Sequence, residues 1–176
     1  SPVGVEQVDV PAGVTREFNL DKALAGKAAA LRLTANKAIV AAIEARTPAD
    51  WATLSATQPA GEKVRATLPL PAGITSSLTV ANPTSTTAHV TVAATDAAGK
   101  SLASSTAELL GSSSISVDVP ASGVLNVAVT SDVPDVRVGV ASTGALGSVQ
   151  GLAVLDLTDA ASVVPTVTVR HDPKFG

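Results

Sequence analysis

The chain has 176 residues, with 15 acidic and 12 basic side chains, a formal net charge of −3 and no cysteine. The acidic balance argues against nucleic-acid binding, because a basic face is needed to neutralise phosphates. The lack of cysteine excludes disulfide bonds, thiolate catalysis and cysteine-ligated zinc or iron–sulfur sites. Apolar residues make up 45% of the chain but aromatic residues only 2%, so we expect a core of small side chains.

Residues 1–71 form the first predicted unit. Its alanine-rich stretch, residues 22–46, favours a helix when only propensity is considered. Apolar residues nevertheless recur at every second position in Ile39, Ala41 and Ile43, which is the period of a β-strand. We therefore predict strands in this unit, and a helix over 22–46 is the alternative.

The chain between residues 74 and 170 alternates apolar and polar residues nearly throughout. Turns rich in Gly, Pro, Asp and Ser interrupt the alternation about every 8 to 12 residues. Strands are predicted at 74–81, 86–95, 101–109, 114–119, 124–130, 135–142, 149–156 and 163–170. Short strands at this spacing predict an all-β fold, and specifically an antiparallel β-sandwich.

An internal repeat relates the two parts of the chain. Residues 37–57 align with 134–154, and residues 63–71 align with 162–170. Leucines and a phenylalanine of the first part also fall on valines of the second: Phe18 on Val117, Leu20 on Val119, and, after a small shift, Leu31 on Val127 and Leu33 on Val129. One structural unit that occurs twice would explain all of these matches.

The repeat predicts tandem Ig-like β-sandwich modules, a partial one at 1–71 and a complete one at 74–173. The modules meet at the short seam Pro71-Ala72-Gly73. The first module lacks counterparts of the first two strands of the second, and such a sandwich would expose core residues and an unpaired edge. We expect the two strands to lie upstream of Ser1 or to come from another chain.

The sequence Asn82-Pro83-Thr84 interrupts the alternation within the second module. Asparagine suits an Asx-turn, and proline ends strand pairing without leaving an N–H unpaired. We predict that Asn82 and Pro83 form a corner between the first two strands of the module, which is a structural role rather than a functional motif.

The stretch LTVANPTSTTAHVTVAATDAAGKSL, followed by SSSISVDVP and VAVTSDVPDVRVGVAS, resembles a family of actinobacterial secreted or cell-envelope proteins of unknown function. The likeness covers most of residues 74–143 and, more weakly, residues 10–57. It implies an extracytoplasmic protein, secreted or anchored in the membrane through an upstream segment, that is built from Ig-like sandwich modules. The family brings no catalytic residues to this chain.

The residues that catalysis would need are few and scattered. His89 lies in the middle of a predicted strand, and His171 follows the last one. No zinc-protease helix motif and no Gly-x-Ser-x-Gly nucleophile turn occurs in the sequence. The turn acids Asp132, Asp135, Asp156 and Asp159 are expected to accept hydrogen bonds from local backbone N–H groups, and a calcium site between the modules is the alternative.

Trp51 is the only tryptophan and the one residue that we predict to contact a ligand. An exposed tryptophan on a sandwich loop would stack on a sugar ring, although glycan-binding modules usually present two or three aromatic residues. The alternative is that Trp51 packs over the end of the first module. An isopeptide bond from Lys22 or Lys100 is disfavoured, because both lysines lie in loop-like contexts.

We therefore expect a non-catalytic, extracytoplasmic structural or protein-interaction module of the bacterial cell envelope. No catalytic, cofactor or metal residues are assigned, and no nucleic-acid partner or membrane span is expected within the chain. The partner is expected to be an envelope protein or a glycan. A glycan-binding module of the cell envelope, with Trp51 as its anchor, is the alternative function.

Overall fold

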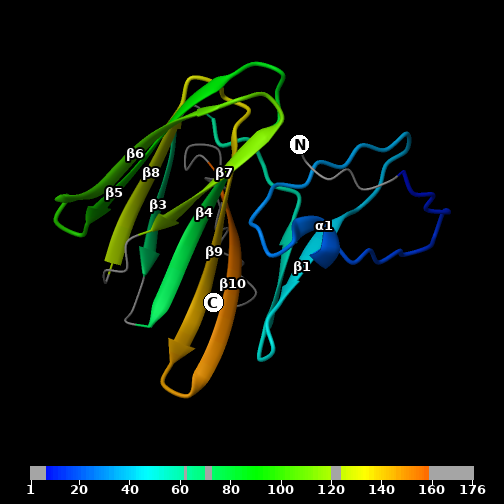
Figure 1. The fold of residues 1–176 in the computed structure, drawn as a ribbon, viewed down its shortest axis with the longest axis horizontal. Helices are drawn as coiled ribbons and strands as arrows, with labels where there is room; N and C mark the ends of the chain where they lie inside the picture. The colour runs from blue at the N-terminus through cyan, green and yellow to red at the C-terminus, as the bar shows by residue number, and fades with distance from the viewer. Residues whose placement is uncertain (1–6, 62, 70–72, 120–123, 159–176) are drawn as a thin grey trace, which may run out of the picture.

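The computed structural model describes residues 7–61, 63–69, 73–119 and 124–158 of the chain (Figure 1). Nearly all of the regular structure is β, and the strands pair antiparallel. The predicted all-β, sandwich-like fold class is therefore confirmed. The elements are α1 (Asp21–Leu24), β1 (Ala42–Arg46), β2 (Trp51–Ser55), β3 (Lys63–Pro69), β4 (Ile74–Asn82), β5 (Ala88–Asp96), β6 (Ser101–Leu109), β7 (Ser113–Val119), β8 (Val124–Ser131), β9 (Arg137–Leu146) and β10 (Val149–Leu157).

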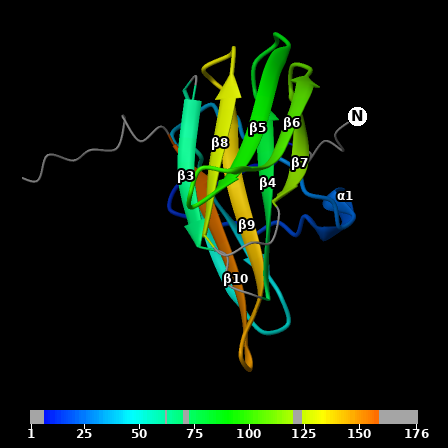
Figure 2. The same ribbon diagram turned by 90° about the vertical axis from the view of Figure 1, so that its left-hand side faces the viewer.

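Two four-stranded sheets face each other and form the sandwich (Figure 2). One sheet has the strand order β10-β9-β4-β7, and the other has the order β3-β8-β5-β6. The first two strands of the predicted second module, β4 and β5, lie in different sheets. The chain must therefore cross between the layers at the corner that follows β4.

The core lies between the two sheets and consists of small apolar side chains. Alternate residues of β4 and β5 point inward, as the period of two requires, and Leu78, Val80 and Val90 are almost completely buried. Val138 of β9 is buried in the same cluster. The low aromatic content is thus accommodated by two closely facing layers of valine, leucine and alanine.

The strands predicted after residue 73 agree closely with those observed. Strands β4 to β10 overlap the predicted ranges 74–81, 86–95, 101–109, 114–119, 124–130, 135–142 and 149–156, in that order. The last predicted strand, 163–170, lies outside the described residues. Alternating valine and threonine between turn residues was sufficient to locate these strands.

Strand β3 joins the sandwich from the N-terminal side of the predicted seam. It pairs with β8, with Val64 opposite Val129, and Val64 is 1% exposed. The repeat assigns residues 63–71 to the first module, whereas the ladder places β3 at the edge of the second sheet. The division of the chain into 1–71 and 74–173 stays a prediction, and the pairing of β3 with β8 joins residues from both sides of it.

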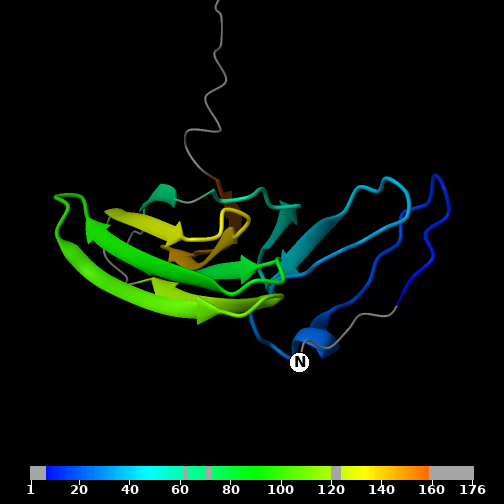
Figure 3. The ribbon, with the colours of Figure 1, turned by 90° about the horizontal axis from the view of Figure 1, so that it is seen from above.

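The segment before β3 is mostly without regular structure and extends away from the sandwich (Figure 3). The helix considered over 22–46 is not formed; α1 has four residues, and residues 25–41 contain neither helix nor strand. Strands around Phe18 and Leu31, which the repeat would imply, are also absent from this described stretch. Isolated strands are not stable without a sheet to pair with, which explains their absence.

Between residues 7 and 61, the sheet that the structure describes is the hairpin formed by β1 and β2. Its register pairs Ala42 with Ser55, and this pair becomes Ala141 and Val154 when 99 is added to each residue number. Ala141 and Val154 are indeed partners in the hairpin of β9 and β10. An offset of 99 also relates Phe18 to Val117 and residues 63–71 to 162–170. The hairpin β1–β2 therefore has the register expected of a second copy of β9–β10.

Candidate functional site

Trp51, the predicted ligand contact, begins β2 at the end of the hairpin. The residue is 63% exposed and lies opposite Arg46 of β1. The Arg46 side chain forms ion pairs with Glu44 and, at 3.8 Å, with Glu17. The hairpin end thus presents an aromatic ring and a charged side chain to solvent. Contact between Trp51 and a ligand stays a prediction.

Asp50, next to Trp51, connects the hairpin to the sandwich. Its Oδ2 accepts a hydrogen bond from the Leu152 N–H of β10 at 2.8 Å, and its Oδ1 accepts one from the Trp51 N–H at 2.8 Å. The bond from Leu152, followed by that from Trp51, lowers the pKa of the Asp50 carboxyl below its usual value. Because Asp50 precedes β2 directly, this carboxylate fixes β2 beside the edge strand β10 (Figure 1).

The stretch that follows the hairpin is also bound to the sandwich. The Gln58 N–H donates to Asp156 Oδ2 at 2.9 Å, and Arg137 Nη1 donates to the Thr57 carbonyl at 2.5 Å. The Ala60 N–H donates to the Val136 carbonyl at 2.8 Å, and Ala60 is 3% exposed. Residues 57–60 are therefore part of the sandwich surface rather than a free linker.

The turn acids do not come together at one place. Asp156 bonds the Gln58 N–H, whereas Asp132 bonds a residue of β5, and Asp159 lies outside the described residues. Both bonds go to backbone N–H groups, but these belong to residues 98 and 43 positions away rather than to the local groups that we predicted. In the part of the chain that the structure describes, no group of three or more His, Cys, Asp or Glu residues is placed to hold a metal ion.

His89 and Asp132 form a surface pair that the sequence did not reveal. Asp132 Oδ2 lies 2.7 Å from His89 Nδ1, and Asp132 Oδ1 accepts the His89 backbone N–H at 2.8 Å. The hydrogen bond between the two side chains raises the pKa of His89 and lowers the pKa of Asp132. Glu108 faces His89 on the neighbouring strand β6 and raises the histidine pKa further.

The pair of His89 and Asp132 joins the ends of two neighbouring strands, and we call it the strand-end clamp. His89 is the second residue of β5 and Asp132 directly follows β8, and these strands are neighbours in one sheet. Their side chains are 66% and 54% exposed, so the pair lies on the surface. The pairing depends on contacts between residues 43 positions apart, which a local sequence pattern does not encode.

Asn82 lies at the predicted corner, and both the oxygen and the nitrogen of its side-chain amide form hydrogen bonds there. Its Oδ1 accepts hydrogen bonds from the N–H and hydroxyl of Thr84 at 3.1 and 2.7 Å, which is the predicted Asx-turn. Its Nδ2 donates to the carbonyls of Thr86 at 2.7 Å and Leu109 at 3.1 Å. Since Asn82 is 1% exposed, its amide is a buried structural group. The predicted corner between the two strands and its Asx-turn at Asn82 are thus confirmed.

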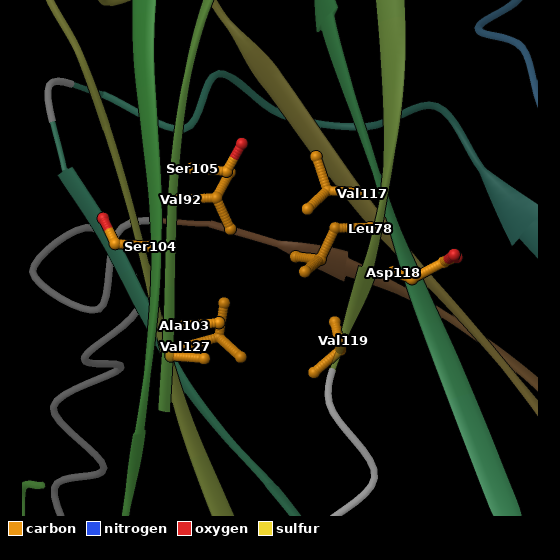
Figure 4. A pocket seen from close by; sticks show the side chains of 10 residues that line it. Leu78, Val92, Ala103, Ser104, Ser105, Val117, Asp118, Val119 and Val127 are labelled. Atoms are coloured by element: carbon orange, nitrogen blue, oxygen red, sulfur yellow. The ribbon is translucent and has the colours of Figure 1, made fainter. Parts of the chain in front are cut away.

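A shallow groove opens between the edge strands β6 and β7 (Figure 4). Leu78, Val117 and Val119 line one wall, and Val92 and Val127 line the other. Its volume is about 110 Å³, whereas ligand pockets usually enclose roughly 300–1,000 Å³. The groove is therefore the open side of the core rather than a site shaped for a small molecule.

The fold and these contacts define an antiparallel β-sandwich with a partly folded segment attached to one edge. Residues 1–120 match a family of unknown function, DUF5719, and the chain belongs to this family. The sequence was expected to belong to a family of unknown function, and this match confirms that expectation.

The remaining comparisons give little beyond the family. No curated protein matches the sequence. Among solved structures, the crystal structure of Thermotoga maritima 1070 is similar, with a TM-score of 0.48 and 15% sequence identity. The match covers 56% of this chain and 94% of that one. Within the described residues, no helix has the length and apolar character required to cross a membrane.

Proposed function

We propose that this protein is a non-catalytic structural or protein-interaction module of the bacterial cell envelope. In this proposal it lies outside the cytoplasm of an actinobacterium and consists of tandem Ig-like modules. The polar side chains best placed for chemistry, such as Asn82, Asp50 and Asp132, already hold backbone groups in turns and between strands. This use of side chains supports a structural rather than a catalytic role.

The observation that carries the proposal is the exposed apolar surface of the N-terminal segment. Its exposed apolar side chains are Val8, Val10, Val14, Phe18, Leu33, Ile39, Val40, Ile43 and Trp51, with exposed fractions between 39% and 103%. Large apolar surfaces left open to water often mark protein–protein contact sites. We infer that a protein partner covers these side chains in the cell.

The location is tested in the actinobacterium that makes the protein. Intact cells are treated with protease, and the protein is followed by antibody in the envelope, medium and cytoplasmic fractions. We expect an envelope or medium protein that protease degrades without cell lysis. A protein found only in the cytoplasm and protected from protease would contradict the proposal.

The role of the exposed segment is tested with the 176-residue chain exported by a standard signal peptide. In one variant Leu33, Ile39, Val40 and Ile43 are replaced by serine, and in the control the exposed sandwich residues Leu102, Leu110 and Val149 are replaced by serine. We expect the washed envelope to retain the wild type and the control but to lose the first variant. Equal release of all three proteins would exclude a role of this segment in partner binding.

Trp51 supports a second candidate, a glycan-binding module of the cell envelope. Its exposed ring beside Arg46 resembles the stacking surface that a sugar requires. Because the chain has one tryptophan, its fluorescence reports on this position alone. Saturable quenching by soluble cell-wall glycans, with calorimetric binding lost in Trp51→Ala, would favour this candidate. The absence of binding to all wall fractions would exclude it.

A further inference from the structure

We propose that the outer edge of β1 is a docking site for an extended β-strand of the same kind as β4. The proposal rests on the proposed protein-interaction function and identifies the partner at one edge. We infer that further strands complete the N-terminal segment to a sandwich. The occupant of the β1 edge would be the one of these strands that corresponds to β4. Binding would occur by strand addition, in which backbone hydrogen bonds extend the existing sheet.

The first support is the shared geometry of the two hairpins. Every residue pair of β1–β2, from the pair Ala42–Ser55 through the pair Arg46–Trp51, becomes a residue pair of β9–β10 when 99 is added to both residue numbers. The same offset relates two other parts of the repeat in the sequence. The strand β1 therefore corresponds to β9, and β2 corresponds to β10.

The second support is that the chain contains the occupied form of this edge. In the complete sandwich β9 lies between β10 and β4, whereas β1 pairs with β2 alone among the described residues. Leu78 of β4 lies opposite Val140, and Ser76 lies opposite Ser142. With the offset of 99, a β4-like strand would place its equivalent of Leu78 opposite Ala41.

The third support is the difference in burial between equivalent side chains. Val138 and Val140 of β9 are 0% and 3% exposed. Ile39, the equivalent of Val138, precedes β1 and is 53% exposed, whereas Ile43 corresponds to the polar residue Ser142 and is 39% exposed. The apolar position that the second sheet and β4 cover at Val138 is therefore open to solvent at Ile39.

The other side of the hairpin is already occupied, which leaves only the β1 edge. Strand β2 lies beside β10, and the Asp50 carboxylate bonds the Leu152 N–H there. A strand that adds to the hairpin must therefore do so next to β1. The occupant should alternate apolar residues with small polar ones, as β4 does with Ile74, Leu78 and Val80.

The proposal is tested by disulfide trapping, which is simple because the chain contains no cysteine. The Ala41→Cys variant of the full chain is mixed with a synthetic peptide of residues 73–83 that carries Leu78→Cys. Two control peptides carry the cysteine at Ser77, on the other strand face, or at Val80, two positions out of register. An Ala52→Cys chain, with its cysteine on β2 instead of directly before β1, is the matched protein control.

We expect the Leu78→Cys peptide to cross-link to Ala41→Cys about tenfold or more faster than either control peptide, because docking raises the local thiol concentration. The wild-type peptide should also slow amide exchange of residues 42–46 in the wild-type chain, which needs no substitution. Equal cross-linking of all three peptides, or unchanged amide exchange, would overturn the proposal. Faster cross-linking between two Ala41→Cys chains would overturn it in favour of a second copy.

This outcome is separable from that of the proposed function. Envelope retention that depends on the exposed segment, without register-specific trapping, would leave the interaction function in place and remove the β4-like strand as the partner. Register-specific trapping in a protein confined to the cytoplasm would support the β4-like strand as the partner and would exclude the proposed function in the cell envelope.

Discussion

Two stretches of the chain carry the same alternating pattern but differ in burial. In β4, Leu78 and Val80 are 1% and 0% exposed. In the N-terminal segment Ile39 and Ile43 alternate in the same way and are 53% and 39% exposed. The strand β4 has neighbours on both edges and a second sheet over its apolar face, whereas β1 has one neighbour, β2, in the part of the chain that the structure describes.

This difference shows that an alternating pattern defines a face but does not bury it. Burial depends on strands distant in the sequence, and the described N-terminal segment contains too few of them to make a second layer. The sandwich should therefore provide most of the free energy of unfolding, because burial of apolar surface is the main stabilising term. The following substitutions compare the two regions directly.

The largest effect is expected from the same truncation made in each region. Leu78→Ala in the core should lower the free energy of unfolding by about 2–5 kcal/mol, because it leaves a cavity among buried side chains. Leu33→Ala in the N-terminal segment should change it by about 0.5 kcal/mol or less, since Leu33 is 59% exposed. Urea unfolding followed by circular dichroism measures both. Similar losses in the two variants would mean that Leu33 is buried in solution.

A buried and an exposed asparagine provide the next comparison. Asn82→Ala should cost about 2–3 kcal/mol, because it leaves the buried carbonyl of Leu109 without its donor and removes the Asx-turn. Asn19→Ala removes one exposed hydrogen bond to the Asp21 N–H and should cost less than about 1 kcal/mol. The same urea titration measures both variants. If Asn82→Ala proved neutral, the corner would not depend on its amide.

The sequence was sufficient to predict the sandwich strands and the corner at Asn82. Both depend on local information, namely period-two alternation and the turn chemistry of Asn-Pro. The predicted strands around Phe18 and Leu31 are not formed, because a strand also needs a partner and none lies next to them in the described segment. Local sequence patterns carry no information about that absence.

The contacts of the candidate sites could not be predicted for the same reason. The bond from Leu152 to Asp50 joins residues 102 positions apart, and that between His89 and Asp132 joins residues 43 positions apart. The proposed repeat aligns residues 37–57 with residues 134–154. It gave an offset of 97 there, and the strand register corrects this offset to 99.

A substitution of Asp50 tests the hydrogen bond that joins the N-terminal segment to the sandwich. Asp50→Ala removes the acceptor of the Leu152 N–H, so amide exchange at Leu152 should become faster while exchange at Val80 in the core stays slow. Asp118→Ala, at an exposed position of β7, is the control and should leave Leu152 unchanged. Exchange is followed by NMR. Unchanged exchange at Leu152 in Asp50→Ala would show that β2 does not depend on this carboxylate to remain beside β10.

The smallest effect concerns the pH dependence of the sandwich at His89 and Asp132. The hydrogen bond to Asp132 raises the pKa of His89 above its usual value of 6.5. A raised histidine pKa contributes stability that is fully present below pH 6.5 and is lost as the pH rises through the folded-state pKa. The lowered pKa of Asp132 contributes stability that is present above pH 3.8 and is lost as the pH falls through its folded-state pKa.

An NMR titration of the His89 ring measures the histidine part of this dependence. Asp132→Asn should return the His89 pKa toward 6.5, because the neutral amide no longer stabilises the imidazolium ion. Glu108→Gln should lower the pKa by less, since Glu108 acts through charge alone and is the smaller cause. Asp132→Asn retains an oxygen for the His89 backbone N–H, so the strand pairing should survive. An identical titration curve for the wild type and Asp132→Asn would show that the side chains are not paired in solution, and the clamp would then consist of the backbone bond alone.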